Sequence, residues 1–476
     1  MTIPGVTITG PTSVFASWYD VTGLAADAVA WAASGAAELL AARNEEPPRA
    51  VTVDRVAACA AFAGERLLRP IGWMRPPIWD PLAGDYRTAD GWVRLHTNYP
   101  HHRASVLAGL GLPADCSSRD VVAAAVAGRR AGEVEAAVVA AGGSAAALRS
   151  PAAWAALRTP ASPTPVPDTP APDAPAPDTP PAGEAVRAPA PVASLSAGSS
   201  RPSAGTTVEF ARRSALSLPP AALPFAGVRV LDLTRVIAGP VATRYLAAYG
   251  ADVLRIDPPG FPEVPALLPE MTPGKRCAFL DLRADQDTFR CLVRQAHVLV
   301  CGLRSGALDR LGLTPATLRA VNPGLITARL NAYGWTGPWT GRRGFDSLVQ
   351  MSCGIAYLDD HSPPAPLPVQ ALDHATGYAL AGWIGRALAE QLRSGHPTDI
   401  RTSLVATASA LTGRPRPALD AGAGAGEISW PETVFETTPT AWGPVRRVRV
   451  PGAIEGVTPR WTVDAGPLGR HPASFG

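Results

Sequence analysis

The stretch GVRVLDLTRVIAGPVATRYLAAYGADVLRIDPPG, residues 227–260, decides the fold class of this chain. An apolar run, VRVLDLT, is followed by a loop that opens an alanine-rich helix, and Gly250 closes that helix before a second apolar run, ADVLRID. Two such runs with a short helix between them are typical of a right-handed βαβ unit with parallel strands. Parallel sheets bind ligands at the carboxyl ends of their strands, so we expect a site near residues 234–240.

The same alternation continues toward the C-terminus. Strands are predicted for CAFLDLR (277–283), AHVLVCG (296–302) and LITARLNAYG (325–334), and helices for residues 285–295 and 315–321. Repeated strand–helix units indicate an α/β fold with a Rossmann-like, mainly parallel sheet. We therefore predict that residues 225–476 form a Rossmann-like large domain.

Residues 159–224 have a different composition, with Pro, Ala, Asp, Ser and Thr in place of large apolar side chains. Such a segment can bury too little apolar surface to fold alone, and its prolines favour an extended chain. We predict a disordered linker there. The preceding residues 12–158 combine predicted helices with a hairpin that turns at residues 88–91, which indicates a smaller α+β domain. The helices are predicted at residues 24–43, 119–127 and 131–141.

Charge and composition disfavour several classes of protein. The net charge of +3 is spread without basic runs, which argues against a nucleic-acid groove or a membrane-surface patch. The six cysteines form no CxxC pair, which argues against a zinc site and structural disulfides and favours a reducing cytoplasm. The first residues lack the features of a signal peptide, and no apolar run approaches about 18 residues. We expect a soluble, cytoplasmic protein with no metal, nucleic-acid or membrane partner.

Two basic features beside predicted strands are candidate ligand contacts. Arg235 lies in the loop that opens the first helix, where free backbone N–H groups favour an anion, although Gly239-Pro240 could simply turn the chain. Lys275 and Arg276 follow a Pro-Gly turn and suit a phosphate, although such pairs are usually just solvated. A nicotinamide site is disfavoured, because only one of the three spaced glycines of that fingerprint is present.

From about residue 223 to residue 411 the chain resembles the family III CoA-transferases, the superfamily of formyl-CoA transferase, carnitine CoA-transferase and α-methylacyl-CoA racemase. The phrases that carry the resemblance stand in family order: residues 227–260, then GKRCAFLDLR, SGALDRLGL, LRAVNPGLI, AYGWTGPW, GFDSLVQMSCGIA and ALDHATG. The resemblance implies an interlocked homodimer whose large domain binds CoA and not a nicotinamide.

The resemblance also implies site residues. The family's nucleophilic aspartate falls on Asp373, in the phrase ALDHATG. The implied CoA-contacting residues are Arg235, Ala238, Gly239, Lys275 and Arg310. Position alone would favour an ordinary helix N-cap for Asp373, a role that aspartate fills well. The surrounding phrase favours the nucleophile instead.

Three departures from the family narrow the chemistry that the resemblance implies. Residues 301–303 are Cys-Gly-Leu where family members commonly have Glu-Asn-Phe, which affects one CoA contact. Ile237 stands in place of the glutamine of formyl-CoA transferase, which disfavours formyl or oxalate chemistry. Phe345 stands in place of the racemases' histidine base, so racemisation is the less favoured branch.

The order of the halves also differs from the family's. DYRTADGWVRLHTNYPHHRA and AAGGSAAALRSPAAW resemble pieces that come late in the family, yet here they precede the large domain. The phrase YDVTGLAA precedes these pieces and resembles LDHATGYA, the phrase that contains Asp373. We therefore infer a rearranged chain with a C-terminal-half-like block at residues 12–158. Asp20 is then a decayed counterpart of Asp373. A chance similarity of two alanine-rich helix starts is the alternative.

Together these features predict transfer of CoA from an acyl-CoA to a carboxylic acid through an aspartyl-CoA thioester on Asp373. CoA and acyl-CoA would be substrates, with no tightly bound cofactor. Ala371, Ala375 and Gly377 would leave room for the thioester, and the helix N-terminus would stabilise developing oxyanions. The alternatives are a non-catalytic CoA-binding protein, an acyl-CoA racemase and a nicotinamide oxidoreductase.

Overall fold

The computed structural model describes residues 3–158, 207–210, 216–417 and 428–476, and its centre is a seven-stranded sheet. The strand order is β10-β9-β8-β11-β12-β13-β7. The strands are β7 (Thr207–Phe210), β8 (Arg229–Leu233), β9 (Asp252–Asp257), β10 (Lys275–Phe279), β11 (Val298–Cys301), β12 (Ile326–Asn331) and β13 (Thr398–Ser403). All pair in parallel except β7, which is antiparallel to β13. The six parallel strands have the Rossmann order 3-2-1-4-5-6, so the predicted fold class is confirmed.

Helices cover both faces of this sheet. Val230 and Val253 point into a core shared with α8 (Ala238–Ala248) and α13 (Ala371–Ser394). Their neighbours Leu231 and Leu254 point into a second core, under α10 (Gln286–Gln295) and α11 (Pro315–Val321). Successive strand residues face opposite sides of a sheet, so strands buried on both faces read as continuous apolar runs. This is why the sequence revealed these strands clearly.

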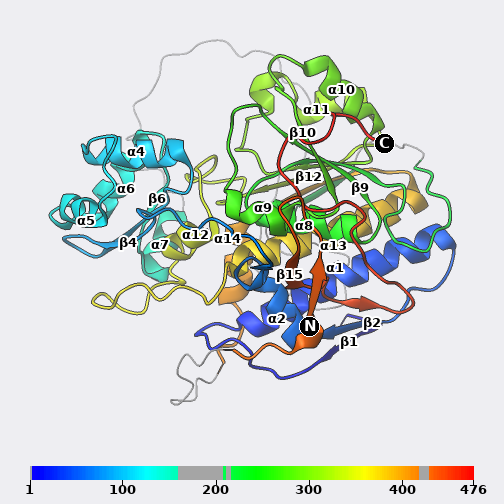
Figure 1. Ribbon diagram of the computed structural model, residues 1–476, viewed down its shortest axis with the longest axis horizontal. Coiled ribbons are helices and arrows are strands. Elements are labelled where there is room, and N and C mark those ends of the chain that lie inside the picture. The colour runs from blue at the N-terminus through cyan, green and yellow to red at the C-terminus, as the bar shows by residue number, and fades with distance from the viewer. Residues whose placement is uncertain (1–2, 159–206, 211–215, 418–427) are drawn as a thin grey trace, which may run out of the picture.

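The N-terminal helix α1 (Val21–Asn44) packs closely against α13 (Figure 1). A Cβ atom added at Gly35 would lie 2.4 Å from the carbonyl oxygen of Gly382, so only glycine allows this approach of the two backbones. Among the described helices, α1 alone is long and apolar enough to span a membrane. However, 89% of its most apolar window is buried inside the protein, which is the pattern of a core helix.

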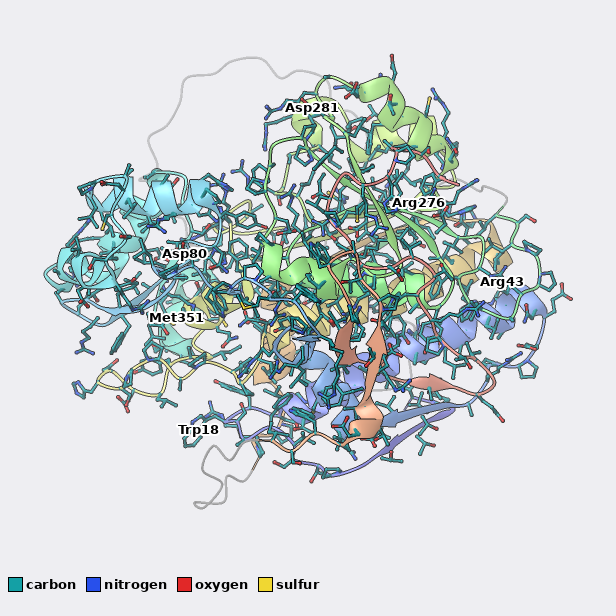
Figure 2. All side chains as sticks on the ribbon, viewed as in Figure 1. Trp18, Arg43, Asp80, Arg276, Asp281 and Met351 are labelled. Atoms are coloured by element: carbon teal, nitrogen blue, oxygen red, sulfur yellow. The ribbon has the colours of Figure 1, made fainter. Side chains whose placement is uncertain are left out.

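A smaller α+β lobe lies to one side of the large sheet (cyan in Figure 1). β4 (Gly84–Arg87) and β5 (Trp92–Leu95) form the predicted hairpin, and β6 (Ala145–Ala147) completes their sheet. The helices of the lobe are α4 (Pro100–Leu110), α5 (Arg119–Ala127), α6 (Ala131–Ala140) and α7 (Pro151–Arg158). Met351, labelled in Figure 2, joins the lobe to the rest of the protein, because it packs against Ala146 from α12 (Asp346–Ser352).

The N-terminal and C-terminal parts of the chain are interleaved. β2 (Val51–Asp54) pairs with both β1 (Val6–Thr9) and the C-terminal strand β16 (Ala453–Ile454). β3 (Arg69–Pro70) pairs with β15 (Val445–Val448), which also pairs with β14 (Phe435–Thr438). The end of the chain therefore completes two sheets that begin near its start. The remaining helices are α2 (Arg55–Phe62), α3 (Gly64–Leu67), α9 (Leu268–Met271) and α14 (Leu404–Thr412).

Most of the predicted linker, residues 159–206 and 211–215, lies outside the described residues. The C-terminal end of that segment differs from the prediction, since residues 207–210 form β7. The guanidinium of Arg43 also holds this end, because it donates hydrogen bonds to the carbonyl oxygens of Pro219, Leu223 and Pro224. Composition could not predict this, because both partners of the segment are far away in the sequence.

Candidate active site

Asp373 lies in the first turn of α13, a helix that packs against α8. A Cβ atom added at Gly377 would lie 2.4 Å from the carbonyl oxygen of Ala238, so glycine is needed for α13 to approach α8 here. This corrects one expectation, because Gly377 makes room for the neighbouring helix and not for a substrate. Gly377 lies one turn after Asp373, so the helix that carries Asp373 contacts Ala238, the first residue of α8 and one of the predicted CoA contacts.

The carboxylate of Asp373 is buried, with only 6% of the residue exposed, and it accepts no hydrogen bond from any described residue. Burial raises the pKa of Asp373 well above its ordinary value, and the nearby negative charges of Asp346 and Glu65 raise it further. The alternative of an ordinary N-cap does not hold, because Gln370 occupies the cap position of α13. A buried acid with no structural hydrogen bond is free to react.

Asp346, at the start of α12, holds the backbone of the candidate nucleophile. Its Oδ2 accepts a hydrogen bond of 2.9 Å from the amide of Asp373, and its Oδ1 accepts one from the side chain of Gln350. Burial raises the pKa of Asp346 to about 6, although these hydrogen bonds oppose the rise. Asp346 therefore caps α13 from another element. The sequence analysis did not identify it, although it directly follows Phe345.

The N-terminal block reaches the same place through Glu65 of α3. Oε2 of Glu65 lies 2.9 Å from Nε2 of His374, and both side chains are buried. The ring of Phe62 stacks on the imidazole of His374, with a centroid distance of 5.4 Å. The sequence analysis missed this pair, because its two members stand more than 300 positions apart.

The loop from β8 to α8 has a strained backbone. Val236 adopts a φ of 66°, which is rare for a β-branched residue, and its amide donates to Oε2 of Glu263. The hydroxyl of Tyr99, from the small lobe, donates to Oε1 of the same glutamate at 2.5 Å. A Cβ atom added at Gly239 would lie 2.2 Å from Cβ of Thr234, so only glycine fits there. Strain of this kind clusters at functional sites.

Arg235, the predicted basic residue of this loop, lies at the carboxyl end of β8. Its guanidinium lies 3.0 Å from Oδ1 of Asp257 and donates to the carbonyl oxygen of Pro262. It also stacks over the ring of Phe261, at 4.3 Å from the centroid. Arg235 is thus in the predicted region, with part of its charge neutralised by Asp257.

Lys275 and Arg310 do not join this group. The amine of Lys275 is buried and lies 3.0 Å from Oδ2 of Asp232, and it also donates to the carbonyl oxygen of Pro240. The expectation that Lys275 faces CoA phosphates is therefore not met, because its charge is used inside the fold. Arg310 is exposed on the short helix Asp309–Leu311, and no described contact links it to Asp373.

Rings from the small lobe surround Phe345, the residue that replaces the racemases' base. The imidazole of His96 stacks face to face on Phe345 at 3.7 Å, and His102 meets it edge-on at 5.7 Å. Burial, then His101 and nearby arginines, lowers the pKa of His102 to about 3, so this imidazole is neutral at neutral pH. Neutral rings thus pack around this end of α12.

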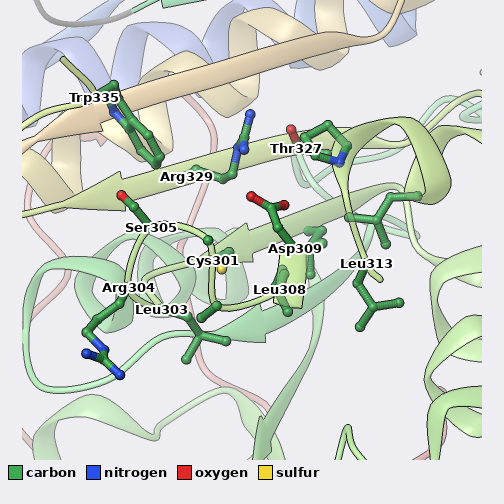
Figure 3. A pocket seen from close by; sticks show the side chains of 15 residues that line it. Cys301, Leu303, Arg304, Ser305, Leu308, Asp309, Leu313, Thr327, Arg329 and Trp335 are labelled. Carbon is green, nitrogen blue, oxygen red and sulfur yellow. The ribbon is translucent and has the colours of Figure 1, made fainter. Parts of the chain in front are cut away.

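A pocket lies against β11 and β12, beside residues 303–309 (Figure 3). It includes Cys301 and Leu303 from the stretch that departs from the family, and Ser305, Asp309 and Arg329 contribute polar atoms. Its volume of about 40 Å³ holds a water molecule or two, and Asp373 does not line it. Among the described residues, no group of three or more metal-binding side chains is placed to hold a metal ion.

A model of CoA-transferase family III matches residues 225–427, which contain Asp373 and the β8–α8 loop. Residues 225–427 are therefore similar to CoA-transferase family III. A protein of Mycobacterium tuberculosis described as a probable fatty acyl-CoA transferase is 33% identical over 40% of this chain and 52% of its own length. A succinate–glutarate CoA-transferase of Agrobacterium fabrum is 31% identical over 40% of this chain and 52% of its own.

The chain thus spans about half the length of these relatives. A crystal structure of the M. tuberculosis protein Rv3272 is 33% identical and covers 40% of this chain and 56% of that one, with a TM-score of 0.37. The family III match ends at residue 427 and begins at residue 225. The rearranged order of the halves inferred for residues 12–158 therefore stays a prediction.

Proposed function

We propose that this chain transfers CoA from an acyl-CoA donor to a carboxylic acid acceptor, with Asp373 as the nucleophile. The environment of the Asp373 carboxylate, inside the segment that matches the family III model, supports this most directly. Its carboxylate is buried, accepts no hydrogen bond from the described residues and has a raised pKa. A carboxylate held in this way is a stronger base and nucleophile than one in water.

The proposed reaction begins when an oxygen of Asp373 attacks the thioester carbonyl of the donor. The bond from carbon to sulfur breaks, which leaves a mixed anhydride on Asp373 and a free CoA thiolate. The thiolate attacks the aspartyl carbonyl, releases the donor acid as its carboxylate and forms an aspartyl-CoA thioester. The first turn of α13 favours the negative charge that develops in these steps.

The second half of the reaction repeats these steps with the acceptor acid. Its carboxylate attacks the aspartyl-CoA thioester and expels the thiolate, and a new mixed anhydride forms. The thiolate then attacks the acceptor's carbonyl, which yields the new acyl-CoA and restores the carboxylate of Asp373. Asp346 keeps the Asp373 backbone fixed throughout, since it binds the amide and not the reacting oxygens.

The proposed reaction does not specify which carboxylic acids serve as donor and acceptor. The names of the relatives differ in the acid, with fatty acyl groups in one and succinate or glutarate in another. The proposal is therefore limited to acyl-CoA and a carboxylic acid as substrates in the cytoplasm. The interlocked homodimer that the resemblance implies is also part of the proposal, and a size measurement at several protein concentrations tests it.

Trapping the intermediate tests the proposed function. The protein is incubated with an acyl-CoA and then with hydroxylamine, which converts an aspartyl thioester into a hydroxamate that mass spectrometry detects. We expect the hydroxamate on the peptide that contains Asp373, and none in the Asp373→Asn variant. Turnover of that variant should fall by roughly 10³-fold or more, while CoA binding persists. CoA binding by the wild-type protein without any hydroxamate would instead identify the non-catalytic alternative.

A further inference from the structure

We propose that Glu65 is a positioning residue for Asp373, acting through the buried contact of its carboxylate with His374. This proposal rests on the proposed function of Asp373, but Glu65 belongs to the N-terminal block, outside the segment that matches the family. The N-terminal block would therefore fix the position and the pKa of the nucleophile in addition to packing against the rest of the protein.

The geometry of α3 and α13 supports this role. Oε2 of Glu65 lies 2.9 Å from Nε2 of His374, and the exposed fractions of the two side chains are 3% and 0%. The backbone of Glu65 is itself fixed, because its carbonyl oxygen accepts a hydrogen bond of 2.7 Å from Arg75. The ring of Phe62 stacks on both His374 and Tyr378. Burial and packing thus hold the side chains of Glu65 and His374 in one arrangement.

His374 directly follows Asp373, so whatever fixes its ring also fixes the turn that carries the nucleophile. Asp346 holds the amide of Asp373 from α12, and Glu65 holds the next side chain from α3. The carboxylate of Asp373 makes no hydrogen bond to any described residue. Its position therefore depends on these two neighbours, which act on the backbone and leave the oxygens free.

Glu65 also acts on the charge of Asp373. The described charged groups that face this part of α13 include Asp346 from α12, Glu65 from α3, Glu270 from α9 and Arg244 from α8. Glu270 acts on His374, and Arg244 acts on Tyr378 in the next turn. The negative charges of Asp346 and Glu65 both disfavour ionisation of Asp373 and raise its pKa, after the larger effect of burial. Loss of the Glu65 charge should therefore let Asp373 ionise at lower pH.

Two variants and a matched control test the proposal. Glu65→Gln keeps the size of the side chain and removes its charge, whereas Glu65→Asp keeps the charge and withdraws it from His374. The control is Glu135→Gln, because Glu135 is another buried carboxylate of the N-terminal block, paired with Arg149 and Arg342. The first measurement is the pH dependence of turnover. The second is a ¹³C NMR titration of the Asp373 carboxyl carbon, assigned with Asp373→Asn.

Glu65→Gln should move both the acid limb of turnover and the NMR midpoint to lower pH. Glu65→Asp should leave the midpoint nearly unchanged and reduce kcat by on the order of 10-fold to 10²-fold at constant KM, because the turn loses its support. Glu135→Gln should lower the melting temperature without moving the midpoint. An NMR midpoint that is the same in Glu65→Gln and the wild-type protein would overturn the proposal. If the wild-type protein forms no Asp373 adduct, the proposed function fails, yet the titration still decides the role of Glu65.

Discussion

The amine of Lys275 lies 3.0 Å from Oδ2 of Asp232, and neither side chain has any exposed surface. Burial opposes ionisation of Asp232, but Lys275 holds its pKa below the ordinary value. We predict that Lys275→Met destabilises the protein by about 3–5 kcal/mol, because Asp232 is left as an unpaired buried charge. Denaturant unfolding measures the change, and the double variant with Asp232→Asn should recover part of it. Lost CoA affinity at unchanged stability would instead restore a phosphate-binding role for Lys275.

Asp373→Asn should make the protein more stable at neutral pH, by a Tm increase of about 2 °C or more. The pKa of Asp373 is higher in the folded protein than in the unfolded chain. Between these two pKa values the folded protein therefore keeps a proton that the unfolded chain has lost. The stability that the wild-type protein has when this group is protonated is therefore lost as pH rises through that window. Melting curves of both proteins should converge at low pH and diverge toward neutral pH. Equal differences at all pH values would contradict the raised pKa.

Asp20 should support the fold and not the reaction. It occupies the N-cap of α1, where its side chain accepts from the amide of Gly23 at 2.7 Å, and it pairs with Arg414. Asp373 occupies the third position of its own helix instead. We predict that Asp20→Ala lowers the free energy of unfolding by roughly 1–2 kcal/mol and leaves turnover per folded molecule unchanged. A loss of turnover comparable to that of Asp373→Asn would show that both acids react.

Gly382→Ala should weaken the packing of α1 on α13. A Cβ atom at Gly382 would lie 2.5 Å from the carbonyl oxygen of Trp31, so the two backbones must move apart. The expected cost is about 1–3 kcal/mol. The matched control is Gly132→Ala in α6, where a Cβ atom meets nothing within 4 Å, and this change should stabilise by roughly 0.5–1 kcal/mol. If both variants lose stability equally, helix propensity and not the close contact explains the result.

The large domain could be predicted from the sequence because its strands are apolar throughout and its helices have clear ends. α5 and α11 have the bounds that the sequence predicted, and α10 differs by its cap residue alone. These elements depend on local signals such as Ser118 and Thr314, which cap α5 and α11 with their side chains. Local signals are in the sequence itself, so a single chain suffices to read them.

The candidate site was predictable only in part, because several of its contacts join distant residues. Asp373 and the loop at residue 235 were found through phrases typical of a family. Glu65 was missed because nothing near it in the sequence suggests a partner at residue 374. Lys275 was placed wrongly for a related reason, since a lysine before a strand indicates a phosphate only if no buried acid takes its charge. Asp232, the acid that does so, lies in the middle of an apolar strand.

The interleaving of β2 with β16 and of β3 with β15 has a practical consequence for engineering the protein. Two polypeptides divided between residues 158 and 207 would still hold each other through these strands and through α1 and α13. Co-expression of such a pair should reconstitute one non-covalent particle. Each polypeptide could then carry its own isotope label. The proposed chemistry of Asp373 could be followed on the labelled C-terminal polypeptide while variants of the N-terminal polypeptide are substituted for one another.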